Sequence, residues 1–256
     1  MITSLLDIAE KELRKLIIQG DLALGQKITE SELARRLGMS KTPVHEALKY
    51  LHREGLVQVR ARQGTFVFDF TEDLVGSLLG VRAILESHAI EEAVRKNRGR
   101  LLHGLGENLK QTVLSGIPVE ESDPLQSPQG RDGLSSSSPS PRLEDAAAAS
   151  PPASMSARGK QAYSRIDAEF HSLFFRHAGN QFLNAAFRSI DAHMQVLWRV
   201  VGNASSWNQG TLRKSVADHE LILQCLHDDD LPAARANLLA HIDSVKRHFL
   251  ELLSAQ

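Results

Sequence analysis

The sequence predicts a mainly α protein in two parts, an N-terminal winged helix-turn-helix and a C-terminal all-α antiparallel helical bundle. Three observations predict this fold class. Within residues 29–68, two short amphipathic segments separated by a glycine precede two apolar runs that flank a basic loop. From about residue 72 onward, apolar residues recur at steps of three and four, which is the period of a helix. Residues 117–160 interrupt this pattern with a low-complexity composition.

The N-terminal elements follow from local signals. Residues 5–19 form an amphipathic helix. Thr29 and Glu32 make a T-x-x-E capping box that begins a second helix. Gly38 ends that helix, because the tight turn after it favours a residue that tolerates a positive φ.

A third helix and two strands complete the expected winged helix. Ser40 can cap the third helix, and Pro43 lies in its first turn, where a missing N–H costs least. The runs 56–59 and 65–68 are predicted strands, the only strands expected in the chain. The basic segment between them is the tip of the wing.

The charge of this region indicates a nucleic-acid surface. Residues 35–64 hold seven Lys and Arg against two acids, although the whole chain has a net charge of −1. This shape and local charge suit the major groove of DNA. The alternative is a solvated basic face on an ordinary small helical domain. The candidate DNA-contacting residues are Ser31, Ser40, Lys41, Thr42, His45, Arg62, Gln63 and Gly64.

The run LARRLGMSKTPVHEALKYLHREGLV resembles the DNA-binding domain of the GntR family of bacterial transcription regulators. The resemblance covers residues 5–70 and implies operator binding. Lys41 and His45 stand where the family usually has arginines that contact the operator. Because Arg pairs bidentately with guanine while Lys and neutral His do not, the family's usual operator sequence is not implied.

Composition narrows the class of protein. A chain of 256 residues with 42% hydrophobic residues is expected to form one or two domains. It contains no run of about 18 apolar residues and no signal-peptide pattern, so neither a membrane span nor secretion is expected. The single cysteine cannot form an internal disulfide. These features favour a cytoplasmic protein.

The expected domains are a winged helix over residues 1–70 and a bundle over residues 71–256. The segment 117–160 contains seven of the nine prolines, ten serines and no aromatic residue. We expect it to be a disordered insertion, because such a composition cannot bury a core. Outside it, helices are predicted over 72–96, 99–115, 161–178, 181–201, 209–228 and 231–253.

A carboxylate and three imidazoles are candidate metal ligands in the bundle. Asp167 and His171 are four residues apart on one helix and therefore share a face. His219 and His241 lie on later helices, within apolar runs. Converging, they would hold a divalent metal, with zinc expected ahead of nickel or manganese. The alternative is core histidines with hydrogen-bond partners, and other histidines could serve instead, namely His177, His193, His227 and His248.

Three motifs resemble the FCD ligand-binding domain of the FadR-like branch of GntR regulators. They are D-x-x-x-H at 167–171, D-H-E-L-I-L at 218–223 and D-L-P-A-A-R-A-N-L-L-A-H-I at 230–242. The resemblance implies that the divalent metal is held by Asp167, His171, His219 and His241. It also implies a small carboxylate effector at an open coordination position. Typical members of the family lack the insertion.

Two arginines are candidates for holding that effector. Arg82 lies four residues before Glu86, so it could pair with a carboxylate ligand or form a structural ion pair with Glu86. Arg199 is a second candidate of the same type.

The sequence therefore predicts a metabolite-responsive transcription regulator that binds a pseudo-palindromic operator as a homodimer. One alternative is a regulator that senses the metal ion itself. Another is a metal-dependent hydrolase fused to a DNA-binding domain, although no further general base stands out.

Overall fold

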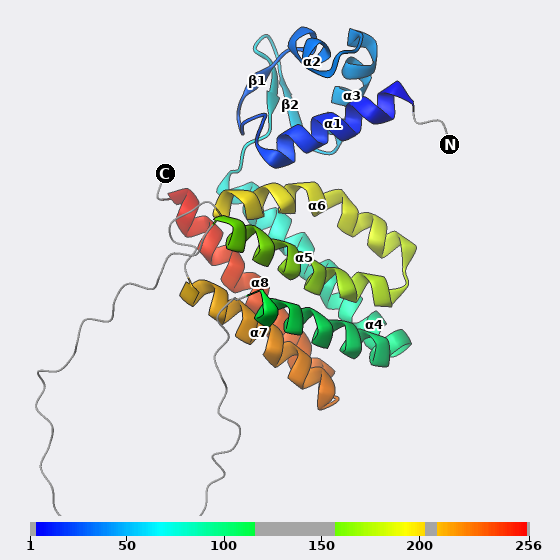
Figure 1. The fold of residues 1–256 in the computed structure, drawn as a ribbon, viewed down its shortest axis with the longest axis vertical. Helices are drawn as coiled ribbons and strands as arrows, with labels where there is room; N and C mark the ends of the chain where they lie inside the picture. Colours follow the sequence, from blue (N-terminus) through cyan, green and yellow to red (C-terminus); the bar gives the residue numbers. More distant parts are fainter. Residues whose placement is uncertain (1–3, 116–156, 203–208, 255–256) are drawn as a thin grey trace, which may run out of the picture.

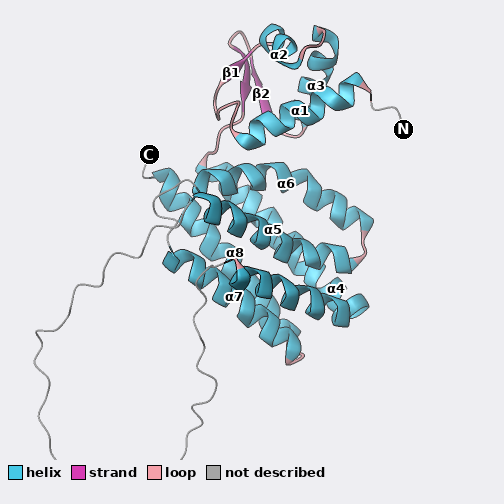
Figure 2. Cartoon of the chain, viewed as in Figure 1, coloured by secondary structure: helices cyan, strands magenta, loops and turns pink. Residues whose placement is uncertain are grey.

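The computed structural model describes residues 4–115, 157–202 and 209–254. A small N-terminal domain of helices and strands sits on one end of a helical bundle (Figure 1). The expected fold class is confirmed, since the strands are confined to the N-terminal domain in the described part of the chain (Figure 2). None of the described helices is both long and apolar enough to span a membrane.

The N-terminal domain is a winged helix-turn-helix. A three-stranded antiparallel sheet of order β1-β3-β2 packs beside three helices. The elements are α1 (Leu5–Gln19), β1 (Lys27–Ile28), α2 (Glu30–Leu37), α3 (Lys41–Arg53), β2 (Val57–Arg60) and β3 (Gly64–Val67). Its core is closed by fully buried side chains from the three helices and from the residue that follows β3, among them Leu13, Ile17, Leu33, Val44, Leu51 and Phe68.

The helix ends mostly follow the local signals. The Thr29 side chain accepts a hydrogen bond from the Glu32 N–H at 3.3 Å, and Gly38 ends α2 with a φ of 64°. Ser40 occupies the N-cap position of α3, but its side chain makes no capping hydrogen bond. The short strand β1 was not predicted, because two residues are too few for a periodic signal and only their pairing with β3 defines them.

Five helices form the described part of the bundle. They are α4 (Glu72–Leu114), α5 (Ala157–Ala178), α6 (Gln181–Gly202), α7 (Gln209–His227) and α8 (Leu231–Ser254). The helices predicted over 72–96 and 99–115 are the two parts of α4, which are joined at a kink where Asn97 has non-helical angles (φ −145°, ψ 37°). The expected insertion lies outside the described residues, except that its last four residues begin α5.

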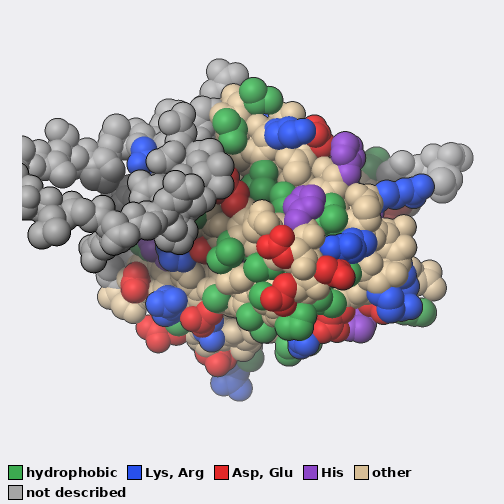
Figure 3. All heavy atoms as spheres, turned by 90° about the horizontal axis from the view of Figure 1, so that it is seen from below, with side chains coloured by type: hydrophobic (Ala, Val, Ile, Leu, Met, Phe, Trp, Pro, Cys, Tyr) green, Lys and Arg blue, Asp and Glu red, His purple; other side chains and the backbone are tan. Residues whose placement is uncertain are grey.

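Long-range packing places α5 and α8 against α4, and α7 against α8. Helix α6 lies next to the winged helix, where it contacts α1 (Figure 1). The far end of the bundle mixes acidic, basic and apolar side chains over the part of that face that is not grey (Figure 3).

Candidate functional site

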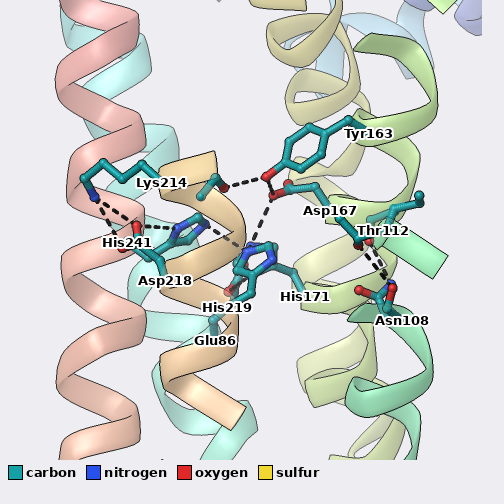
Figure 4. A network of polar contacts seen from close by, with 12 residues as sticks. Glu86, Asn108, Thr112, Tyr163, Asp167, His171, Lys214, Asp218, His219 and His241 are labelled. Atoms are coloured by element: carbon teal, nitrogen blue, oxygen red, sulfur yellow. Dashed lines mark hydrogen bonds and ion pairs between the residues drawn. The ribbon is translucent and has the colours of Figure 1, made fainter. Parts of the chain in front are cut away.

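The four predicted metal ligands meet at the centre of the bundle. Asp167 and His171 come from α5, His219 from α7 and His241 from α8 (Figure 4). One ligand atom from each residue lies within 4.8 Å of those of the other three. All four residues are buried, with no more than 3% of their surface exposed. Among the described residues, this cluster matches the predicted set of ligands residue for residue.

Neighbouring carboxylates orient the imidazoles. The Nδ1 atom of His171 lies 2.6 Å from Glu86 Oε2, and the Nδ1 atom of His241 lies 3.3 Å from Asp218 Oδ2. In both rings Nε2 is therefore the nitrogen left for a ligand. The Nε2 atom of His219 faces the same point, 3.3 Å from that of His241. Carboxylates that accept from the other nitrogen of a metal-binding histidine fix its tautomer and orientation in this way.

Asp167 is also held in place. Its Oδ1 atom lies 3.6 Å from His219 Nε2 and 3.2 Å from the Tyr163 hydroxyl. That hydroxyl lies 2.5 Å from Ser215 Oγ on α7. Phe170, one turn earlier than Phe174 on α5, stacks on the His219 ring at 3.9 Å. These contacts come from side chains that no motif singled out, since only the fold brings them beside the ligands.

Two atoms of the cluster are buried without a partner among the described residues. They are Asp167 Oδ2 and His171 Nε2. Buried polar atoms are nearly always hydrogen-bonded, so an unsatisfied pair facing one point indicates a missing partner. One carboxylate oxygen and three imidazole nitrogens are a donor set that suits zinc, and nickel or manganese to a lesser degree. The residues present therefore fit a divalent cation.

The surroundings of the histidines favour their neutral form, which is the form that binds a cation. Burial lowers the pKa of His171 and of His219 well below the usual range, and the positive charge of Arg82 lowers both further. Both rings are thus neutral at pH 7, as metal ligands must be. Burial raises the pKa of Asp167 and of Glu86, while the Arg82 guanidinium acts against this rise. A cation at the cluster would favour the charged carboxylates.

Arg82 forms the structural ion pair and keeps one donor unused. Its Nε lies 2.5 Å from Glu86 Oε1, and the side chain is 3% exposed. Its Nη1 atom is buried without a hydrogen-bond partner among the described residues. Arg82 therefore positions Glu86, which orients His171, and still has one N–H group for a further acceptor.

Arg199 lies elsewhere. A Cβ atom added to Gly20, at the end of α1, would be 2.5 Å from Arg199 Nη1, so the guanidinium lies against the winged helix. The structure does not bring Arg199 to the cluster, and its expected role in effector binding has no geometric support. The apolar periodicity of α6 predicts which face of the helix is buried, but it does not predict which element packs against each face.

The predicted DNA-contacting residues all lie at the surface. Each of the eight is exposed: Ser31, Ser40, Lys41, Thr42, His45, Arg62, Gln63 and Gly64. Lys41 begins α3, and Arg62 lies at the wing tip with a positive φ of 63°. Neither forms an ion pair with a described residue. Lys27 of β1, which the sequence did not suggest, lies beside Gly64 and adds a positive charge to the wing.

His45 is less free than its neighbours. Its Nδ1 atom lies 2.6 Å from Glu30 Oε1, at the start of α2. Only Nε2 remains available to DNA. Because the pair joins residues 15 apart in sequence, the family pattern gave no sign of it.

Comparison with known proteins identifies both domains. Residues 7–67 match the model for bacterial regulatory proteins of the gntR family, and residues 141–244 match the FCD domain. The chain belongs to the GntR family. The FCD match begins inside the segment expected to be an insertion and excludes α4, although α4 supplies Glu86 and Arg82.

Relatives of this GntR-family chain are transcription regulators. It is 33% identical over 112 residues to the gluconate operon transcriptional repressor of Bacillus licheniformis, covering 44% of this chain and 45% of that protein. It is 40% identical over 73 residues to the probable D-xylose utilization operon transcriptional repressor of Paenarthrobacter nicotinovorans, covering 28% of this chain and 32% of that protein. The chain thus aligns with less than half the length of these relatives.

Solved structures of GntR-type proteins share the whole fold. E. coli McbR/YncC has a TM-score of 0.65 at 19% identity, covering 99% of this chain and all of the other. A putative transcriptional regulator GntR from Rhodococcus sp. RHA1 also has a TM-score of 0.65, at 15% identity, covering 96% of this chain and 97% of the other. At these identities the likeness supports the arrangement of the two domains.

Proposed function

We propose that the protein is a DNA-binding transcription regulator controlled by a small carboxylate at a buried metal site. The observation that carries this proposal is the cluster of Asp167 and three histidines, in which two buried atoms have no partner in the described part of the chain. The cluster lies in the bundle, while the exposed basic residues lie on the winged helix. Sensing and DNA binding thus belong to separate domains.

The proposed effector is a carboxylate because of two features near the cluster. Four protein ligands leave one or two coordination positions open in a five- or six-coordinate metal site, and carboxylate oxygens bind such ions well. The Nη1 atom of Arg82 is a buried donor next to Glu86 and could hold a second oxygen. A charge-assisted bond of this type is stronger than a neutral one and selects for an anion.

The proposed DNA partner is a pseudo-palindromic operator bound by a homodimer. A single winged helix reads only one half-site, and two-fold dimers matching two-fold operators are the usual solution. The matched relatives named by function are repressors, which makes repression the simplest form of regulation here. These names also give no support to the hydrolase alternative.

The metal site can be tested directly. Zinc binding is measured by calorimetry on protein freed of metal with a chelator. His219→Ala removes one of four ligands and should reduce zinc affinity by at least tenfold. His227→Ala, an exposed histidine on the same helix, should bind zinc like wild type. Equal zinc affinity in all three proteins would overturn the proposed site.

The effector class is tested by DNA binding. A duplex selected from a random pool with the purified protein serves as the probe, and organic acids are titrated in zinc-loaded protein. We expect at least one hydroxy acid, sugar acid or amino acid to change DNA affinity, and chelator to abolish its effect. A response to zinc alone, unaffected by every acid, would instead make the protein a metal sensor.

A further inference from the structure

Helix α6 is the part of the bundle that meets the winged helix. It packs against α1 on one side and against α4 and α5 on the other. In Figure 1 it lies between the N-terminal domain and the helices that carry the metal cluster. It supplies no ligand to that cluster.

His193 of α6 reaches the base of the wing. Only 8% of the residue is exposed, and its Nε2 atom lies against Gly55, whose backbone is placed to accept a hydrogen bond from the ring. The ring also lies edge-on to Phe68 at 4.8 Å. Gly55 turns the chain from α3 into β2, with a φ of 80°, and Phe68 follows β3. One imidazole from the bundle therefore contacts both ends of the β2–β3 hairpin and the end of α3.

Two ring contacts tie α6 to the helices that carry metal ligands. Phe187 stacks on Phe175 of α5 at 4.0 Å, one turn beyond His171. Trp198 lies 5.7 Å from Phe249 of α8, the helix of His241. A change in the spacing of α5 and α8 would therefore reach α6 through close-packed rings, which shift together rather than deform.

We propose that His193 is the positioning residue through which the metal site controls the wing. Ligands on α5, α7 and α8 must approach one point when a cation binds, and α6 contacts two of these helices. The Gly55 and Phe68 contacts of His193 then carry the shift to the hairpin. Arg199 contacts the winged helix at a second point, because its guanidinium lies at the C-terminus of α1. The last turn of α1 has no basic residue of its own, so this positive charge suits the negative end of the helix dipole. This inference rests on the proposed metal site and adds its route to the DNA-binding domain.

The test is hydrogen exchange of the full-length protein, followed by mass spectrometry, with zinc or with chelator. Peptides from 166–175 and 216–223 report the metal site, and peptides from 52–58 and 65–70 report the base of the wing. In wild type, zinc should slow exchange in both groups. In His193→Ala, zinc should still slow exchange at the metal site, but its effect at the base of the wing should be lost.

Two further variants separate coupling from general damage. His193→Gln keeps an N–H donor for the Gly55 backbone and should restore part of the zinc effect on the wing. Gln195→Ala changes an exposed α6 residue whose side chain donates to Asp191 of the same helix, and it should behave like wild type. If His193→Gln and His193→Ala lose the zinc effect at the wing to the same extent, the hydrogen bond to Gly55 does not carry the coupling.

The outcomes distinguish this inference from the proposed function. If zinc slows exchange at the metal site of wild type but not at the wing, the site exists and His193 does not couple it. If His193→Ala keeps full zinc protection at the wing, the coupling runs elsewhere and the inference is overturned. If zinc slows exchange at neither place in wild type, the metal site itself is wrong.

Discussion

Lys41 begins α3 with an exposed ammonium group and no ion pair among the described residues. Lys41→Ala should weaken binding to the selected duplex by about 1–3 kcal/mol if the contact is to a base edge. If the contact is to a phosphate, the slope of log affinity against log salt concentration should instead become shallower by about one. Lys110→Ala, an exposed lysine on α4, is the control. Affinity and salt dependence like wild type would exclude Lys41 from the interface.

His193 should make stability depend on pH. Burial lowers the pKa of its ring, an effect reinforced by Arg14 and opposed by the Gly55 hydrogen bond and by Glu54. The unfolded chain therefore takes up a proton as the pH falls below the ordinary value of 6.5, before the folded chain does. The contribution of the neutral ring to the free energy of unfolding is therefore complete above this pH. It decreases as the pH falls, by at most about 1.4 kcal/mol per pH unit.

The measurement compares wild type with His193→Gln in denaturant titrations between pH 8 and 5, with chelator present. Other titrating groups are common to both proteins, so the difference in slope belongs to residue 193. We expect a shallower loss of stability in His193→Gln below pH 6.5. Parallel curves would show that the ring is protonated equally in the folded and unfolded chains.

At the scale of an element, the kink in α4 holds the end of α5. The Asn97 amide donates to the carbonyl of His177, and the Lys96 ammonium donates to that of Ala178, each at 2.9 Å. These carbonyls belong to the last turn of α5, which has no partners of its own for them. A helix end that is held in this way keeps α5, and so Asp167 and His171, in register.

Asn97→Ala should therefore lower the free energy of unfolding by about 0.5–1.5 kcal/mol, the usual contribution of one hydrogen bond. Arg95→Ala, which removes an exposed side chain two residues away, should change it by less than about 0.5 kcal/mol. Chemical denaturation at pH 7 gives both values. An Asn97→Ala variant as stable as wild type would show that water replaces this cap without loss.

The elements that the sequence predicted well are those with strong local signals. The bounds of α1 and the start of α6 match the structure, because apolar period and caps define them. The D-x-x-x-H spacing and its family likeness gave all four residues of the cluster. Glu86, by contrast, is 85 residues from His171, and its role depends on how α4 crosses α5. The contact of Arg199 with the end of α1 was not predicted for the same reason, since a single helix does not define its neighbours.

At the scale of the whole molecule, metal should stabilise the fold by mass action. Zinc is expected to bind the folded cluster and not the unfolded chain, in which residues 167 and 241 are far apart. The free energy of unfolding should then rise by about 2.7 kcal/mol at a zinc concentration 100-fold above the dissociation constant. The size of the rise depends on concentration, which separates binding from a fixed effect of salt. Unfolding in denaturant, with zinc buffered at several concentrations, measures it.

The matched variants make this prediction specific to the cluster. His219→Ala should lose most of the zinc dependence, while His227→Ala should keep it in full. Without metal, His219→Ala should lower stability only by the loss of a buried ring that stacks on Phe170, and this loss does not depend on zinc. If zinc stabilises His219→Ala as much as wild type, the ion binds elsewhere. A fall in stability with zinc would show that it binds the unfolded histidines more tightly than the folded cluster.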